Sequence, residues 1–235
     1  MKKPTLILIL FLFTACAIGG YLAASKINIG SSNSNSGAQS LTTALASSQQ
    51  NFLLVRVDDL SSTTPQLVEA WVVFTAYSDP PQVMFMPLYP AYDASKNKTL
   101  SDAFAIGSDG KLTSRLQQTI AKEFDFSLNG NIVIDSTGMD GLAGWFGISG
   151  IQVNSVPATT DLDVHNILVN SQFFFQNVCA QLKSGQAKAQ FDSIKWSKLI
   201  PAHFQTDLSF EHLMASWDRI LRDAAPQQCD VLSNE

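Results

Sequence analysis

Arginine is scarce in this sequence. Among 235 residues it occurs only at Arg56, Arg115, Arg219 and Arg222. Charged residues of all kinds make up 15% of the chain, and there is no cluster of lysine or arginine beyond Lys2 and Lys3. A protein that binds DNA or RNA needs many cations to neutralise phosphates. The net charge of −5 also gives no excess of positive charge. The sequence therefore argues against nucleic-acid binding.

Residues that build common catalytic and zinc motifs are also sparse. The three histidines, His165, His203 and His212, lie far apart, and no Cys or His occurs at the spacing of zinc ligands. The sequence contains no G-x-S-x-G motif and no P-loop. These absences argue against a zinc site, an elbow-type serine hydrolase and a P-loop enzyme.

Cysteine occurs at only three positions, and Cys16 falls in an N-terminal apolar segment. The other two, Cys179 and Cys229, form an even pair, which an oxidising compartment would favour as an intrachain disulfide. Such a bridge would join the C-terminal tail to an internal helix. Two separate thiols are the alternative.

The first long apolar run of the chain predicts a membrane anchor. Pro4–Ser25 carries no formal charge, and a helix of that length spans the ~30 Å hydrocarbon layer of a bilayer. Two lysines before the run favour a cytoplasmic N-terminus and an exported body. We predict an uncleaved signal-anchor helix in residues 1–25, which makes the chain a single-pass cell-membrane protein with an extracytoplasmic domain. Cleavage near Ala24 and lipidation of Cys16 are alternatives that also give an envelope protein.

The composition changes twice after the anchor. Residues 26–50 are rich in Ser, Asn, Gln and Gly, which is typical of a flexible linker. Residues 51–235 have the apolar and aromatic content of one folded domain, large enough to bury its own core. We therefore predict an anchor, a linker and a single extracytoplasmic domain.

Short apolar runs predict the strands of this domain. The run 51–57 ends at Asp58-Asp59 and indicates a buried strand that places two acids at its end. The continuous run 70–76 is typical of a strand covered on both faces. The turn residues Asp79-Pro80-Pro81 and the run 82–86 complete a hairpin, and 131–135 and 151–153 indicate two further short strands.

Helices are expected between and after these strands. Residues 100–106, 113–124 and 139–146 have helical patterns, and 167–182 is apolar almost all round. Phe173-Phe174-Phe175 in that segment either packs in the core or lines an apolar tunnel. Residues 209–222 are amphipathic, with Thr206 or Ser209 at the start. Strands interspersed with helices predict an α/β fold, an α-β-α sandwich with a central mixed sheet flanked by helices.

The order of these elements resembles the LytR-CpsA-Psr (LCP) family over roughly residues 51–222. The pieces that carry the resemblance are Asn51-Phe52-Leu53-Leu54-Val55 before Asp58, Met86-Pro87 at the family's "IPRD" element, 135–153 against "DFDGF…ALGGVDV", and Thr206-Asp207-Leu208-Ser209. The resemblance implies a cell-envelope protein related to enzymes that transfer polyprenyl-pyrophosphate-linked glycopolymers to the cell wall. It also implies an apolar tunnel for the lipid, Mg²⁺ on the pyrophosphate, and several arginines around the phosphates.

Carried over residue by residue, the acids of the family motif survive and the arginines do not. Asp58 falls on the first acid and Glu69 on the acid of "R-x-D", so both are candidate ligands for Mg²⁺. Leucine stands at the expected arginine positions 60 and 67, and Leu88-Tyr89 replaces Arg-Asp after Pro87. Guanidinium groups placed in advance stabilise the charge that develops during phosphoryl transfer. Their loss predicts a catalytically degenerate domain.

The candidate binding residues are therefore Asp58, Arg56 and Arg115, with Asp58 and Glu69 as candidate metal ligands and no residue assigned to catalysis. Arg56 lies in an apolar run, so pairing with a nearby acid is expected ahead of phosphate binding. We predict a domain that binds a polyprenyl-linked or cell-wall glycopolymer. The alternatives are an active glycopolymer phosphotransferase that uses Arg56 and Arg115 with Mg²⁺, and an envelope structural or protein-interaction module.

Overall fold

The computed structural model describes residues 49–148, 156–185, 195–221, 226 and 228–233. The expected anchor, nearly all of the linker, Cys16 and the expected strand at 151–153 lie outside these residues. None of the described helices is both long enough and apolar enough to cross a bilayer. The membrane anchor and the extracytoplasmic location therefore remain predictions.

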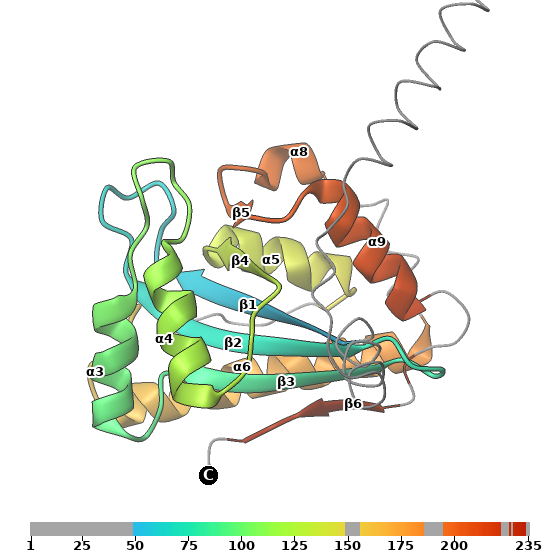
Figure 1. Ribbon diagram of the computed structural model, residues 1–235, viewed down its shortest axis with the longest axis horizontal. Helices are drawn as coiled ribbons and strands as arrows, with labels where there is room; N and C mark the ends of the chain where they lie inside the picture. Colours follow the sequence, from blue (N-terminus) through green and yellow to red (C-terminus); the bar gives the residue numbers. More distant parts are fainter. Residues whose placement is uncertain (1–48, 149–155, 186–194, 222–225, 227, 234–235) are drawn as a thin grey trace, which may run out of the picture. The chain divides into compact units, whose positions relative to one another are not determined.

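The domain is built on a mixed sheet of six strands (Figure 1). The order across the sheet is β5-β4-β1-β2-β3-β6. The strands are β1 (Gln49–Val57), β2 (Leu67–Ala76), β3 (Gln82–Tyr89), β4 (Gly130–Ile134), β5 (Phe204–Thr206) and β6 (Gln228–Val231). The pairs β1–β2, β2–β3 and β4–β5 are antiparallel, whereas β4 runs parallel to β1 and β6 parallel to β3.

The central strands are covered on both faces, as their apolar runs predicted. Six of the seven residues in the run 51–57 are apolar or asparagine, and every residue of that run is buried. Such a strand can be stable only between two layers of side chains, because both faces of its pleat are apolar. The hairpin of β2 and β3 is confirmed, with the turn at the predicted proline pair.

Helices flank the sheet on both sides. They are α3 (Ala94–Ala103), α4 (Ser114–Phe124), α5 (Ser136–Trp145), α6 (Asp161–Ser184), α8 (Trp196–Leu199) and α9 (Phe210–Leu221). Side chains of α3 and α4 pack on one face, and side chains of α5, α6 and α9 pack on the other (Figure 1). The predicted α/β class, a mixed sheet flanked by helices, is confirmed.

Alternate residues of β1 divide between two apolar clusters. Leu53, Val55 and Val57 point into the α3/α4 cluster, and Leu54 points into the α5/α6/α9 cluster. Arg56 follows Leu54 by two residues, so its side chain lies on the α5/α6/α9 face. The sheet therefore presents its one buried guanidinium among the described residues to that layer.

Several element boundaries differ from those expected from the sequence. Helix α3 begins at Ala94, because the Asp93 carboxylate accepts hydrogen bonds from the backbone N–H groups of Ser95 and Lys96. It ends at Ala103 and not at 106. The edge strands β5 and β6 were not predicted; each has only three or four residues.

The ends of α6 and α5 are set by local chemistry. Thr160 and Asp163 form a capping box at the start of α6, and Gly185 ends the helix with a φ of 72°. In α5, a Cβ at Gly138 would lie 2.1 Å from the carbonyl oxygen of His203, so only glycine allows this close approach. These contacts fix α5 against the segment that leads into β5.

Candidate functional site

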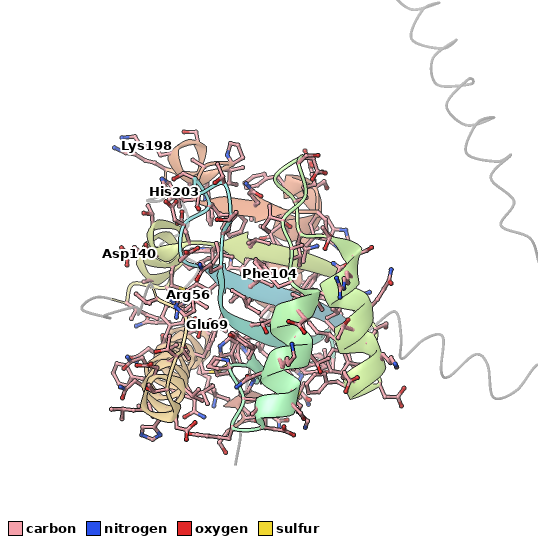
Figure 2. The ribbon with its side chains drawn as sticks, turned by 90° about the vertical axis from the view of Figure 1, so that its left-hand side faces the viewer. Arg56, Glu69, Phe104, Asp140, Lys198 and His203 are labelled. Carbon is pink, nitrogen blue, oxygen red and sulfur yellow. A yellow bond between two sulfur atoms is a disulfide. The ribbon has the colours of Figure 1, made fainter. Side chains whose placement is uncertain are left out.

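Arg56 and Glu69 form a buried ion pair on the α5/α6/α9 face of the sheet. They lie directly opposite one another on β1 and β2, and Arg56 Nε lies 2.5 Å from Glu69 Oε1. Both residues are only 2% exposed. Figure 2 shows the two side chains next to one another on the side of the sheet that carries α6. The expected pairing of Arg56 with a nearby acid is therefore found, and the acid is Glu69.

Two more donors complete the environment of the Glu69 carboxylate. Trp71 Nε1 donates to Oε2 over 3.1 Å, and the hydroxyl of Ser171 on α6 donates to the same oxygen. Each carboxylate oxygen thus has at least one donor that is part of the protein. These hydrogen bonds allow the Glu69 carboxylate to be buried, because burial of a carboxylate without partners would be strongly unfavourable. We therefore assign Glu69 a structural role.

The acid pair after β1 organises the connection to β2. Asp58 Oδ1 accepts hydrogen bonds from the backbone N–H groups of Asp59 and Gln66, and Asp59 Oδ1 accepts from the hydroxyl and N–H of Ser61. The hydrogen bonds from Ser61 hold the pKa of the exposed Asp59 carboxyl below its usual range. Both acids therefore stabilise the loop between β1 and β2 through these hydrogen bonds.

A third acid lies at the same edge of the sheet, because β4 runs parallel to β1 and also ends there. Asp135 follows β4, accepts a hydrogen bond from Gly138 N, and has its other oxygen 2.8 Å from His203 Nδ1. His203 also interacts electrostatically with Asp59. We call Asp58, Asp59, Asp135 and His203 the acidic edge. Sequence reasoning missed His203 here, since its place depends on the unpredicted strand β5.

Arg115 is not brought together with the other predicted site residues. It is exposed on α4, whose buried side chains pack on the α3/α4 face of the sheet. Arg56 points to the opposite face. The predicted set of Arg56, Arg115, Asp58 and Glu69 is thus divided by the sheet, and no single ligand contacts all four in this arrangement.

The residues proposed for Mg²⁺ do not fit the ion as they are arranged. A hard cation needs several open oxygen ligands, whereas the oxygens of Glu69 already accept hydrogen bonds from protein donors. In the described ranges, no group of three or more His, Cys, Asp or Glu side chains could hold a metal ion. Mg²⁺ binding at Asp58 remains a prediction from the resemblance.

The leucines at the expected arginine positions have a packing role. Leu67 and Leu88 are buried in the α3/α4 cluster, and Leu60 packs against the same cluster. All three therefore contribute apolar area to the core on the face away from Arg56. Replacing any one of these leucines with arginine would place a charge in that core or against it.

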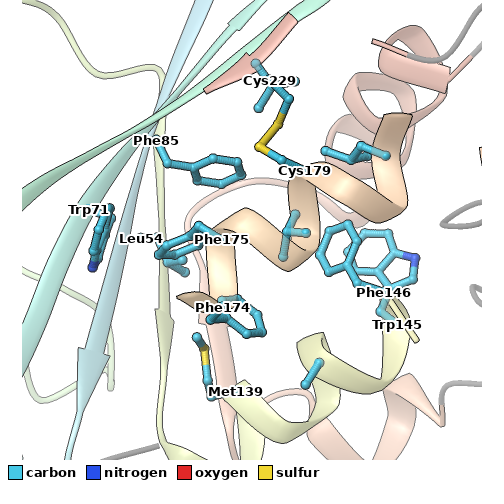
Figure 3. Close-up of a cluster of buried hydrophobic side chains, with 14 of the residues drawn as sticks. Leu54, Trp71, Phe85, Met139, Trp145, Phe146, Phe174, Phe175, Cys179 and Cys229 are labelled. Atoms are coloured by element: carbon cyan, nitrogen blue, oxygen red, sulfur yellow. A yellow bond between two sulfur atoms is a disulfide. The ribbon is translucent and has the colours of Figure 1, made fainter. Parts of the chain in front are cut away.

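An apolar cavity lies between the sheet and the helices on the α5/α6/α9 face, and we call it the central cavity. Its volume is about 140 Å³. Its lining side chains are apolar except for two hydroxyls: Phe52, Leu54, Val73, Thr75, Val83, Phe85, Ile132, Leu142, Trp145, Phe146, Phe174, Phe175, Val178, Leu182, Leu213, Ser216, Trp217 and Ile220. Figure 3 shows Leu54 and Phe85 of the sheet facing Phe174 and Phe175 of α6.

The central cavity is closed at the end nearest the ion pair. Trp71 lies beside Glu69 and packs on Phe175 with ring centroids 4.6 Å apart, and both rings are buried. Farther along the same face, Val73 and Ile132 stay partly exposed although they belong to central strands. Central-strand residues that face a helix layer are normally buried. Val73 and Ile132 therefore keep part of their surface uncovered by protein, as do Leu142 and Leu213 in the facing helices.

A group of hydrogen-bonded polar side chains lies where β1 begins. The hydroxyl groups of Tyr77 and Ser216 both donate to Gln50 Oε1, over 2.7 and 3.1 Å, and Thr75 donates to the Gln50 carbonyl. The guanidinium of Arg219, one turn along α9 from Ser216, lies 3.9 Å from the centroid of the Tyr77 ring. Of these five residues, Thr75 and Ser216 line the central cavity, and the hydroxyl groups of both already donate to Gln50.

The predicted disulfide between Cys179 and Cys229 is present. It joins α6 to β6, and β6 in turn pairs with Val83 and Phe85, which line the central cavity. Figure 3 shows the bridge beside Phe85. The disulfide thus fixes one wall of the cavity.

No protein-family model matches the sequence, and no curated protein matches it. Solved structures are similar to it. They include protein gbs0355 from Streptococcus agalactiae (13% identity, 80% of this chain and 79% of that chain, TM-score 0.48). TagT bound to LI-WTA (11%, 80% and 79%, 0.46) and TagV from B. subtilis (9%, 79% and 84%, 0.45) are also similar.

The resemblance to the LytR-CpsA-Psr family stays the interpretation made from the sequence, because solved structures with these identities and TM-scores show neither the family, the ligand nor the activity of this chain. The domain is therefore interpreted through its own residues: the buried ion pair, the acidic edge and the central cavity.

Proposed function

We propose that this LCP-like domain binds the hydrocarbon part of a lipid-linked glycopolymer and has little or no transferase activity. The observation that carries the proposal is the central cavity, which is apolar, lies between the sheet and the helices and is lined in part by the partly exposed Val73 and Ile132. Transfer of hydrocarbon from water into such a site lowers the free energy. The predicted anchor would hold the domain beside the membrane that contains such lipids.

The size of the cavity limits what enters it in this conformation. Its volume of about 140 Å³ is close to that of an engineered apolar cavity of roughly 150 Å³ that stays dry and binds benzene. A short stretch of hydrocarbon therefore fits, and a complete polyprenyl chain does not. A longer chain requires either that α9 move away from the sheet or that most of the chain remain outside.

The positions of Arg56 and Arg115 support the proposal of little or no transferase activity. Transfer of a phosphoryl group requires cations that are in place before charge develops on the phosphate oxygens. Arg56 is already paired with Glu69, and Arg115 lies over the opposite face of the sheet. An active transferase that uses both arginines is therefore less well supported than a binding domain.

Tryptophan fluorescence of the full chain in nanodiscs tests the binding function directly, because Trp145 and Trp217 line the cavity. Geraniol, a short polyprenyl alcohol, should bind saturably and change this fluorescence. Val73→Phe fills the cavity and should abolish the change. The matched control Ile106→Phe adds bulk to the α3/α4 cluster and should leave it intact.

Two results would contradict the proposal. One is the absence of saturable geraniol binding in folded protein. The other is equal binding by the wild type and Val73→Phe. Separately, hydrolysis of a polyprenyl pyrophosphate at an enzymatic rate by the wild type, lost in Asp58→Ala, would reinstate the transferase alternative and the predicted metal role of Asp58.

A further inference from the structure

We infer that the exposed face of α6 binds a second copy of this chain, through antiparallel pairing of the two α6 helices. This face lies on the side of α6 that points away from the central cavity, so the inference does not depend on the hydrocarbon site. In a pair related by a two-fold axis each contact occurs twice. We call the surface the outer face of α6, and it consists of Leu162, Asn166, Val169, Phe173, Gln176 and Ala180.

Exposed apolar side chains are concentrated on this face and beside it. Leu162, Val169 and Phe173 are 67%, 46% and 59% exposed. The exposed ring of Tyr92 lies beside them, because its hydroxyl is 3.2 Å from Nδ1 of His165 in the same helix. Apolar side chains that share one surface mark a site of interaction, since covering them removes apolar area from water.

The outer face is also uncharged along most of its length. Between Val164 and Leu182, α6 contains no Asp, Glu, Lys or Arg. The exposed face of a helix normally carries charged side chains. An uncharged face meets an identical one without repulsion between like charges. The amide groups of Asn166 and Gln176 both donate and accept hydrogen bonds, so they complement one another.

The spacing of the outer face defines how two copies fit together. Its six residues follow one another at alternating intervals of four and three, which is the a/d spacing of a coiled coil. In an antiparallel pair centred at the level of Ser171, each position of the face meets another position of the same face. The pairs are Leu162 with Ala180, Asn166 with Gln176, and Val169 with Phe173. Amide therefore meets amide, and apolar side chains meet apolar ones.

Charges at the two ends of α6 favour the antiparallel direction. The first turn contains Asp161 and Asp163, and the last turn contains Lys183. Antiparallel pairing brings Lys183 of each copy to the acidic first turn of the other. Parallel pairing would instead place the two acidic turns side by side. The helix dipoles also favour the antiparallel arrangement.

Sedimentation velocity of the full-length protein in detergent micelles tests the pairing. The wild type should dimerise as its concentration rises. Phe173→Lys should weaken dimerisation at least about a hundredfold, because it places two charges in the interface. Phe210→Lys replaces another exposed phenylalanine, on α9, and is the matched control, which should dimerise like the wild type. A wild type that stays monomeric, or equal dimerisation by Phe173→Lys, would overturn the inference.

Charge reversal tests the direction of the pair. Lys183→Glu should weaken dimerisation roughly fivefold, since it affects two exposed ion pairs in each dimer. The double variant Asp161→Lys/Lys183→Glu should restore it. No recovery in the double variant would contradict the antiparallel arrangement.

Cross-linking tests the register in a Cys16→Ala background. A mixture of Val169→Cys and Phe173→Cys chains should form disulfide-linked dimers more readily than either variant alone. More efficient cross-linking of Val169→Cys by itself would indicate parallel helices and contradict this register.

A bilayer is the other occupant that an apolar face could have. In nanodiscs that hold a single chain, brominated lipid should leave the added fluorescence of Phe173→Trp unquenched. Quenching there would place lipid on the outer face of α6 and overturn the assignment to a second copy.

Discussion

The two faces of the sheet differ in how completely they are packed. On the α3/α4 face, Leu53, Val55, Leu116 and Ile120 are fully buried in one apolar cluster. The α5/α6/α9 face contains more aromatic rings, a buried ion pair, a disulfide and an open cavity. Empty volume and buried charge both lower stability. Their concentration on one face is the physical basis for proposing the hydrocarbon site on that face.

The largest expected effect concerns the ion pair. Glu69→Leu should lower the free energy of unfolding by about 3–5 kcal/mol, because Arg56 would remain buried without its partner. Denaturant titration measures the loss. The double variant Arg56→Leu/Glu69→Leu should recover most of it. A single variant as stable as the wild type would mean that the pair is not buried as described.

The second-largest expected loss of stability concerns the disulfide between Cys179 and Cys229. Its partners are 50 residues apart, so replacing both cysteines with alanine should cost about 2–4 kcal/mol. Thermal unfolding with and without reductant measures this loss, and reductant should not affect the double variant. Cys16→Ala, outside the described residues, is the control, and a similar loss there would contradict the assignment.

A pair of leucine truncations sharpens the comparison of the two faces. Leu116→Ala, in the filled α3/α4 cluster, should cost about 3 kcal/mol, because it creates a new void. Leu213→Ala, which lines the existing cavity and is partly exposed, should cost about 1 kcal/mol. Equal losses in denaturant titrations would show that the two faces are packed alike.

The smallest expected effect concerns the start of α6. Hydrogen bonds from the N–H and hydroxyl of Thr159, and then from Thr160, hold the pKa of the Asp163 carboxyl below its usual range. Because the folded-state pKa is lowered, the stabilisation is present above the unfolded-state pKa and is lost as pH falls through the folded one. The difference in thermal midpoint between the wild type and Asp163→Asn should therefore shrink between about pH 5 and pH 2. A difference that is independent of pH would contradict this role.

The sequence was sufficient for most of the fold because its central strands are continuous apolar runs. The runs 51–57 and 70–76 led directly to β1 and β2, and the proline turn led to the hairpin. Strands β5 and β6 could not be found this way, since three or four residues of mixed polarity carry no periodic signal. The start of α3 was missed although Asp93 offered a helix-capping signal.

The candidate site was predictable only in part. The pairing of Arg56 could be expected, because a charge within an apolar strand requires a partner. The hydrogen bonds from Trp71 and Ser171 could not be expected, because they depend on how α6 packs on the sheet. Of the Phe173-Phe174-Phe175 run, the last two line the cavity and Phe173 is exposed. A cavity is a property of packing, so its volume could not be predicted from the sequence.

The most direct test of the central claim is a titration of the methyl-labelled full-length protein with geraniol, followed by NMR. The methyl signals of Val73 and Ile132 should shift and saturate together, while those of Leu116 and Ile120 on the other face stay unchanged. Shifts confined to exposed apolar residues such as Leu162 and Val169, with Val73 and Ile132 unaffected, would contradict a hydrocarbon site inside the fold.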